Sequence, residues 1–124
     1  MAEILIAEDD EDVRSTVCRA LELAGHVVHA TGDGAEALKY LHAKPGNVDL
    51  VLTDIKMPVM DGVALALSVA KTWPDLPILM MTGFADQRER ANGLETLIRG
   101  VIAKPFTLQE IQAAVANVLP DKSS

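Results

Sequence analysis

The stretch Val48-Asp49-Leu50-Val51-Leu52-Thr53-Asp54 is a short apolar run that stops at a carboxylate. Similar runs elsewhere in the chain stop at Glu8 and Asp9, at Thr82 and at Lys104. Short apolar runs that alternate with segments of helical periodicity are typical of a parallel sheet covered by helices on both faces. The sequence therefore predicts an α/β protein in which these polar groups follow buried strands.

Five strand-then-helix units can be placed along the chain. The expected strands are Glu3–Glu8, His26–Ala30, Val48–Thr53, Ile78–Met81 and Arg99–Ala103. The expected helices are Glu11–Leu23, Gly34–His42, a helix from Asp61 to about Thr72, Asp86–Leu97, and a last helix that begins at Thr107.

Helix ends and inner faces are predicted from capping residues and from apolar spacing. Asp33, Asp61 and Thr107 are expected N-caps, and Glu110 completes a capping box with Thr107. In the helix after Asp61, the residues expected to face the sheet are Val63, Ala66, Leu67 and Ala70.

Right-handed crossovers with helices on both faces favour a doubly wound, five-stranded parallel sheet in the order 2-1-3-4-5. That order reverses between the first and third strands, and ligands bind beyond the carboxyl ends of the strands at such a point. Glu8, Asp9 and Asp54 follow these two strands. The connectivity alone thus predicts a site at the carboxylates.

Carboxylates that converge repel one another unless a cation lies between them, and a small oxygen-rich cluster suits Mg²⁺. Together with the Thr82 hydroxyl and the Lys104 ammonium, the expected carboxylates make a site for handling phosphoryl groups. Each signal also has a simpler interpretation: Asp54 as a cap, Thr82 as part of a turn, and Lys104 as a surface lysine. Residues 10–12 fit a solvated helix N-terminus, where acidic groups favour the dipole.

Length and composition limit the classes of protein. With 124 residues, one domain is expected over residues 1–120, followed by a polar tail at 121–124 and no output domain. The net charge of -7 argues against nonspecific nucleic-acid binding but allows protein partners with basic surfaces. The single cysteine, Cys18, excludes an intrachain disulfide. With no basic-apolar leader and no long apolar span, we expect a cytoplasmic protein that does not enter a membrane.

Four segments carry a resemblance to a known family. They are Ile4-Leu5-Ile6-Ala7-Glu8-Asp9-Asp10, the run from Leu52 through Asp54, Met57-Pro58 and Asp61-Gly62, then Met81-Thr82-Gly83, and finally Lys104-Pro105-Phe106. Over almost its whole length the chain resembles the receiver domain of two-component response regulators. It resembles the stand-alone receivers, such as the chemotaxis regulator, and the resemblance implies a flavodoxin-like fold.

The resemblance implies a role for each polar group. Asp54 would accept a phosphoryl group from the phosphohistidine of a sensor histidine kinase or phosphotransfer protein, and Lys104 and Thr82 would contact that group. The ligands of Mg²⁺ would be Asp9 and Asp54 directly, Glu8 mainly through a water, and the carbonyl of Lys56. The Lys104-Pro105 bond would be cis. The phosphorylated form would act by binding an unidentified downstream protein, and the chain would not be an enzyme beyond its own phosphorylation and dephosphorylation.

One residue departs from the family pattern. Val101 stands where receivers usually have Tyr or Phe, whose ring rotates as the threonine moves. With Asn92-Gly93 inside the expected helix 86–97, an order–disorder change of residues 84–97 is the hypothesis for signal output.

Two other functions compete with this interpretation. A haloacid-dehalogenase-type phosphatase needs a second acid two residues after the nucleophile, where this chain has Lys56. A degenerate receiver that only binds partners is disfavoured by the retained Asp9, Asp54, Thr82 and Lys104.

Overall fold

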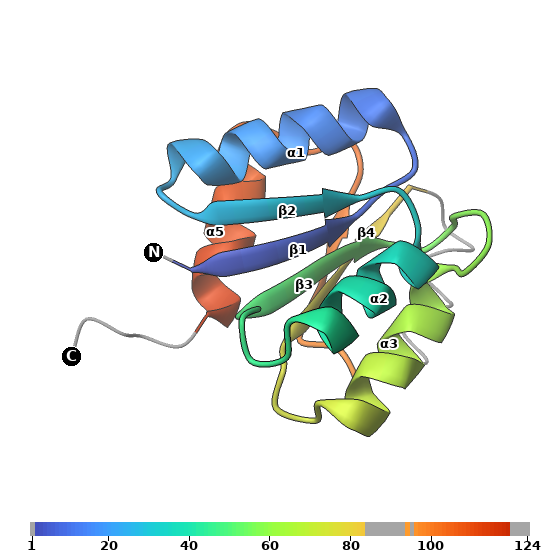
Figure 1. Cartoon of the computed structure of the whole chain (residues 1–124). Helices are drawn as coiled ribbons and strands as arrows, with labels where there is room; N and C mark the ends of the chain where they lie inside the picture. Colours follow the sequence, from blue (N-terminus) through green and yellow to red (C-terminus); the bar gives the residue numbers. More distant parts are fainter. Residues whose placement is uncertain (1, 84–93, 95, 120–124) are drawn as a thin grey trace.

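Five parallel strands form the centre of the molecule, and helices lie on both sides of them (Figure 1). The computed structural model describes residues 2–83, 94 and 96–119. The strands are β1 (Glu3–Ala7), β2 (Val27–Thr31), β3 (Leu50–Asp54), β4 (Ile78–Thr82) and β5 (Gly100–Ala103). The described helices are α1 (Glu11–Leu23), α2 (Gly34–Ala43), α3 (Gly62–Thr72) and α5 (Leu108–Val118).

The strand order is β2-β1-β3-β4-β5 and every pairing is parallel, so the predicted doubly wound sheet is confirmed. The register places Ala7 beside Thr53, and Asp54 beside Met81. Thr82 pairs with Ala103, the residue before Lys104. The polar residues at the ends of β1, β3, β4 and β5 therefore lie along one edge of the sheet.

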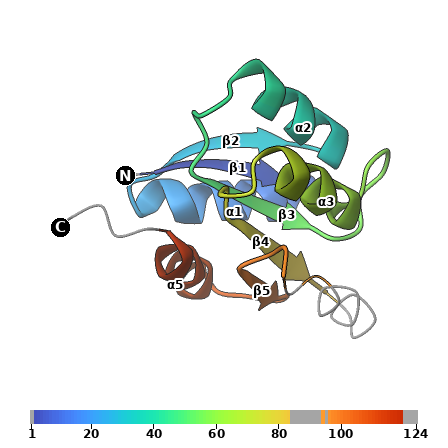
Figure 2. The same ribbon diagram turned by 90° about the horizontal axis from the view of Figure 1, so that it is seen from below.

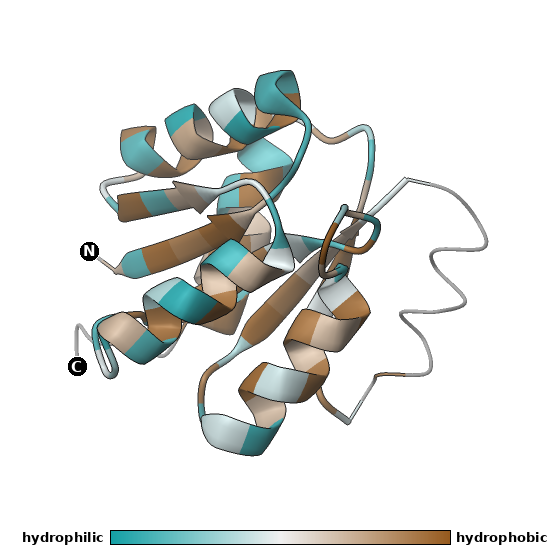
Figure 3. Ribbon diagram, turned by 45° about the vertical axis from the view of Figure 1, so that its right-hand side comes forward, coloured by the Kyte–Doolittle hydropathy of each residue, from teal (hydrophilic) through white to brown (hydrophobic). Residues whose placement is uncertain are grey.

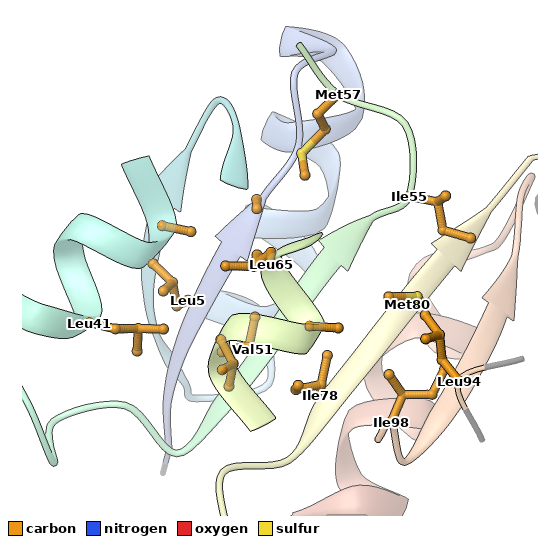
Figure 4. Packing of buried hydrophobic residues seen from close by; sticks show 14 of the residues in the cluster. Leu5, Leu41, Val51, Ile55, Met57, Leu65, Ile78, Met80, Leu94 and Ile98 are labelled. Carbon is orange, nitrogen blue, oxygen red and sulfur yellow. The ribbon is translucent and has the colours of Figure 1, made fainter. Parts of the chain in front are cut away.

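Two separate apolar layers hold the helices against the sheet. Helices α1 and α5 pack together on one face, and α2 and α3 pack together on the other (Figures 1 and 2). Alternate strand residues supply the two layers: Leu5 and Val51 point toward α2 and α3, whereas Ile6 and Leu52 belong to the α1–α5 side. Figure 4 shows the first layer, and Figure 3 shows that β1, β3 and β4 are apolar along most of their length. Burial on both faces explains why these strands are continuous apolar runs.

The predicted helix starts are confirmed by their hydrogen bonds. The carboxylates of Asp33 and Asp61 accept from the N–H groups three residues on, at 2.8 and 2.9 Å. Thr107 and Glu110 form the expected capping box. Strand β3 begins two residues later than predicted, at Leu50.

Two further expectations concern the helix at residues 86–97 and the absence of a membrane span. Most of the expected helix 86–97 lies outside the described residues. Among the described residues, no helix is long and apolar enough to cross a membrane.

The predicted inner face of α3 is partly wrong. Leu65, Ala66 and Val69 are fully buried, whereas Leu67 is 51% exposed. Because α3 carries apolar residues on nearly every side, apolar spacing could not select the buried face. The helix is instead oriented at its first residue, Gly62, whose N–H donates to the Ile55 carbonyl at 2.7 Å. A Cβ atom at this glycine would overlap the Asp54 carbonyl.

Replacing Gly62 with alanine is therefore expected to destabilise the fold, since the new methyl group would meet backbone that cannot rotate away. We expect a loss of about 1–3 kcal/mol in the free energy of unfolding, measured by urea denaturation. Gly32→Ala is the matched control, because its Cβ would meet only the ends of two flexible side chains, Glu36 at 3.2 Å and Arg14 at 3.7 Å. Equal stability of the two variants would contradict the close contact.

Candidate functional site

Three carboxylates converge at the edge where the strand order reverses. Oxygen atoms of Glu8, Asp9 and Asp54 all lie within 4.8 Å of one another. Glu8 and Asp54 are buried, whereas Asp9 is exposed. The sequence predicted this grouping from strand order, and the structure brings all three residues together. An oxygen-rich cluster with one side open to solvent has the donor set of a divalent cation site.

Lys104 reaches into the same cluster. Its ammonium lies 2.7 Å from a carboxylate oxygen of Glu8 and 3.2 Å from one of Asp54. Its backbone N–H donates to the Thr82 carbonyl at 2.6 Å, and the peptide bond to Pro105 is cis, as expected. These contacts are not those of a freely solvated surface lysine, so that alternative is set aside.

Burial and neighbouring charges together set the protonation states of Glu8 and Lys104. Burial raises the pKa of Glu8 to about 7, although the hydrogen bonds from Lys104 and from the Asp10 N–H act to lower it. Burial acts to lower the pKa of Lys104, but the hydrogen bond with Glu8 and the negative charge of Asp54 outweigh it and raise that pKa. Lys104 therefore carries its charge at neutral pH and is the cation of the site.

The first turn of α1 holds Glu8 in place. The N–H of Asp10 donates to one Glu8 carboxylate oxygen at 3.1 Å, and the guanidinium of Arg14 donates to the Glu8 carbonyl at 2.9 Å. The Asp10 carboxylate caps α1 by accepting from the N–H groups of Asp12 and Val13. The interpretation of residues 10–12 as a helix N-terminus therefore fits, while the contribution of Arg14 was missed.

Thr82 ends β4 beside the strand end that carries Lys104, and its hydroxyl has no hydrogen-bond partner among the described residues. Its Oγ1 atom is buried and makes no hydrogen bond there. By contrast, the buried Thr53 hydroxyl donates to the Asp54 carbonyl at 2.8 Å. Because an unpaired buried hydroxyl is costly, Thr82 is suited to a hydrogen bond with a bound group.

The side chain of Asp54 is held by two different groups. The Ile55 N–H donates to its Oδ1 atom at 2.9 Å, and Lys104 contacts its Oδ2 atom. The Asp54 side chain is thus oriented by the backbone directly after β3 and by Lys104, which follows β5. The alternative of Asp54 as a helix cap is wrong, because Asp61 caps α3.

The loop between β3 and α3 carries Lys56, whose side chain is exposed. The far end of the loop is held against α2 by a hydrogen bond from the Gly34 N–H to the Met60 carbonyl at 2.9 Å. Val59, at the tip, is 87% exposed and has a φ of 66°, which is strained for a β-branched residue. Sequence reasoning missed this conformation because glycine or asparagine is the usual signal for it.

A cavity of about 640 Å³ extends from Asp54 and Lys104 toward α1. Its apolar wall includes Val13 and Phe106. Phe106 belongs to the segment Lys104-Pro105-Phe106 that was singled out from the sequence, but its place in a cavity wall was not predicted. Because Asp54 and Lys104 line this cavity, it opens directly onto the site.

The Lys104→Met variant is expected to raise the pKa of Glu8 above its value of about 7, because both the hydrogen bond and the charge of Lys104 lower it. Carboxyl-carbon NMR titration without divalent cations measures this pKa directly. Burial raises the pKa of Glu8 from 4.5 to about 7, so the folded protein binds this proton more tightly than the unfolded chain does. The resulting contribution to stability is full below pH 4.5 and is lost as the pH rises through 7. Lys39→Met, an exposed lysine on α2, should leave the titration unchanged; an equal effect would refute the pairing.

Comparison with known proteins gives consistent results. The chain is 39% identical over 119 residues to the response regulator receiver protein CpdR of Brucella abortus (strain 2308), covering 96% of this chain and 98% of CpdR. It is 35% identical over 118 residues to the sensor kinase CckA of the same strain, covering 95% of this chain but only 12% of CckA. A solved structure of the chemotaxis response regulator CheY4 of Vibrio cholerae superposes with a TM-score of 0.85 at 30% identity, covering 96% of this chain and 99% of that chain.

The family model of the response regulator receiver domain matches residues 4–116, which include all the polar groups of the site. The similarity to CpdR and CheY4 extends over nearly the whole of each protein, as expected for stand-alone receivers. The chain therefore belongs to the receiver domain family of two-component response regulators, whose members are switched by phosphorylation.

Proposed function

We propose that Asp54 is the phosphoryl acceptor of this receiver and that the phosphorylated form acts by binding another protein. The observation that carries the proposal is the position of Asp54: a buried carboxylate contacted by the Lys104 ammonium, within 4.8 Å of two other acidic side chains. The donor would be a phosphohistidine. A carboxylate oxygen of Asp54 attacks the phosphorus, the P–N bond breaks, and its electron pair returns to the imidazole.

The acidic cluster fits Mg²⁺ by its chemistry, since three carboxylates with an exposed side match a hard cation that keeps several waters. Asp9 and Asp54 would bind the ion directly, Glu8 would act mainly through a water, and the carbonyl of Lys56 would complete the shell. When bound, the ion supplies positive charge that offsets the charge on the phosphoryl oxygens.

Lys104 and Thr82 would recognise the phosphoryl group itself. The ammonium of Lys104, which here lies between two carboxylates, would pair with a phosphoryl oxygen and offset its growing charge. The buried Thr82 hydroxyl would donate a hydrogen bond to the same group and so gain the partner that it lacks among the described residues. Thr82 ends β4, so its movement would pull on the chain that follows.

The way in which phosphorylation changes the binding surface must differ from the usual one, because Val101 replaces the usual aromatic residue. Val101 lies on β5 and is 42% exposed. A valine has no ring that could rotate when Thr82 moves. An order–disorder change at residues 84–97 is therefore our hypothesis for the output, and most of that segment lies outside the described residues.

The partners follow from the family. A sensor histidine kinase or a phosphotransfer protein would supply the phosphoryl group, in keeping with the similarity to part of the sensor kinase CckA. A phosphatase of external substrates is disfavoured because Lys56 stands where such an enzyme needs an acid. We further propose that the chain works in the cytoplasm and that residues 1–120 form one receiver domain.

Asp54→Asn should abolish labelling by radioactive acetyl phosphate, because the amide keeps the shape of the side chain but is not a nucleophile. Asp33→Asn is the matched control, since asparagine also caps helices and the residue lies at the start of α2. This control should label like the wild type. Labelling of Asp54→Asn at the wild-type level would disprove the acceptor assignment.

The two remaining acidic residues should differ in their effect on Mg²⁺ binding, measured by isothermal titration calorimetry. Loss of a residue that acts through water costs roughly 10-fold in metal affinity, and we expect this for Glu8→Ala. Asp9→Ala should cost more, because it removes a direct ligand. The reverse order would contradict the assignment of direct and water-mediated roles.

A further inference from the structure

The peptide group between Glu8 and Asp9 joins two of the three carboxylates of the site. Its carbonyl oxygen accepts a hydrogen bond from the Nη1 atom of Arg14 at 2.9 Å. Arg14 lies on α1, which starts just beyond the carboxyl end of β1 (Figure 1). Among the described residues, the Arg14 side chain forms this one hydrogen bond and no ion pair. Its guanidinium therefore acts on the backbone between the two acidic residues.

The neighbouring strand does not supply a donor for the Glu8 carbonyl. β2 ends at Thr31, whose carbonyl accepts from the Glu8 N–H at 3.1 Å. The next N–H along the chain, that of Gly32, donates to the Glu36 carboxylate at 3.1 Å instead. A Cβ atom at Gly32 would lie 3.7 Å from Nη1 of Arg14. Since Glu8 is buried and a buried carbonyl without a partner is costly, Arg14 replaces the donor that β2 lacks.

The direction of the Asp9 side chain depends on the peptide groups on either side of it. Asp9 is exposed, and its side chain makes no hydrogen bond among the described residues. Arg14 holds the carbonyl of the first peptide group, and the Asp10 N–H of the second donates to the Glu8 carboxylate at 3.1 Å. Rotation of the first peptide group would turn the Asp9 carboxylate away from Glu8 and Asp54, which now lie within 4.8 Å of it.

We propose that Arg14 is a positioning residue of the metal site, because it holds the Glu8–Asp9 peptide group so that the Asp9 carboxylate faces Glu8 and Asp54. This inference rests on the proposed function, in which Asp9 binds Mg²⁺ directly. The charge and the hydrogen bond of Arg14 act in opposite directions on that binding. A positive charge near the carboxylates repels a cation, whereas the hydrogen bond keeps a ligand in place. The sign of the change on removing Arg14 therefore separates the two effects.

Arg14→Met removes both the charge and the hydrogen bond. We expect the Mg²⁺ affinity, measured by isothermal titration calorimetry, to fall about tenfold, the lower end of the range for residues that orient metal ligands. Loss of the charge alone would raise the affinity. The matched control is Arg19→Met, the same substitution at an exposed position of α1, and it should not weaken binding. Thermal melting checks that both variants fold.

The outcomes distinguish this inference from the metal site on which it rests. An unchanged or higher Mg²⁺ affinity of Arg14→Met, or an equal loss in Arg14→Met and Arg19→Met, would refute the role of Arg14 while leaving the metal site intact. Absence of Mg²⁺ binding by the wild-type protein would refute the metal site itself, and the role of Arg14 with it.

Nuclear magnetic resonance without Mg²⁺ tests the hydrogen bond in the wild-type protein. Because the bond restricts rotation of the guanidinium, the two Nη atoms of Arg14 should give separate nitrogen signals, whereas those of the exposed Arg19 should be averaged. The carbonyl carbon of Glu8 should also shift upfield in Arg14→Met and not in Arg19→Met. A freely rotating Arg14 guanidinium in the wild type would overturn the proposal, whether or not the variant folds.

Discussion

The interaction on which the site depends is the bridge that Lys104 makes between two buried carboxylates. Glu8 and Asp54 come from neighbouring strands and would repel each other if both were charged without a partner. The ammonium of Lys104, from the far side of the sheet, offsets that repulsion while burial keeps the pKa of Glu8 at about 7. The receiver site is thus a cluster of charge that tertiary structure holds together.

This cluster also explains why the site is ready to accept a charged group. A bound cation or phosphoryl group would take over contacts that Lys104 and the carboxylates now make with one another. Thr82 contributes the complementary feature, a buried hydroxyl with no partner among the described residues. Under the proposed function, the residues that contact one another in the resting protein would also contact the phosphoryl group.

The rest of the fold positions this edge of the sheet with backbone contacts. Capping by Asp61 and the close approach of Gly62 to the Asp54 carbonyl fix α3 directly behind Asp54. Gly34 ties the loop between β3 and α3 to α2 through Met60. Strain at Val59 lies at the exposed tip of that loop.

The sequence by itself favoured the observed strand order and located Glu8, Asp9 and Asp54, because the apolar runs end at carboxylates and the helices between them must cover both faces of the sheet. Capping residues such as Asp33 and Thr107 were also local signals. Tertiary structure alone decided the rotation of α3, with Leu67 outside and Leu65 inside, since a helix that is apolar on nearly every side has no preferred face until Gly62 meets Asp54. It also decided that Lys104 pairs with Glu8, because that contact joins residues 96 positions apart and depends on distance in space rather than on any local pattern.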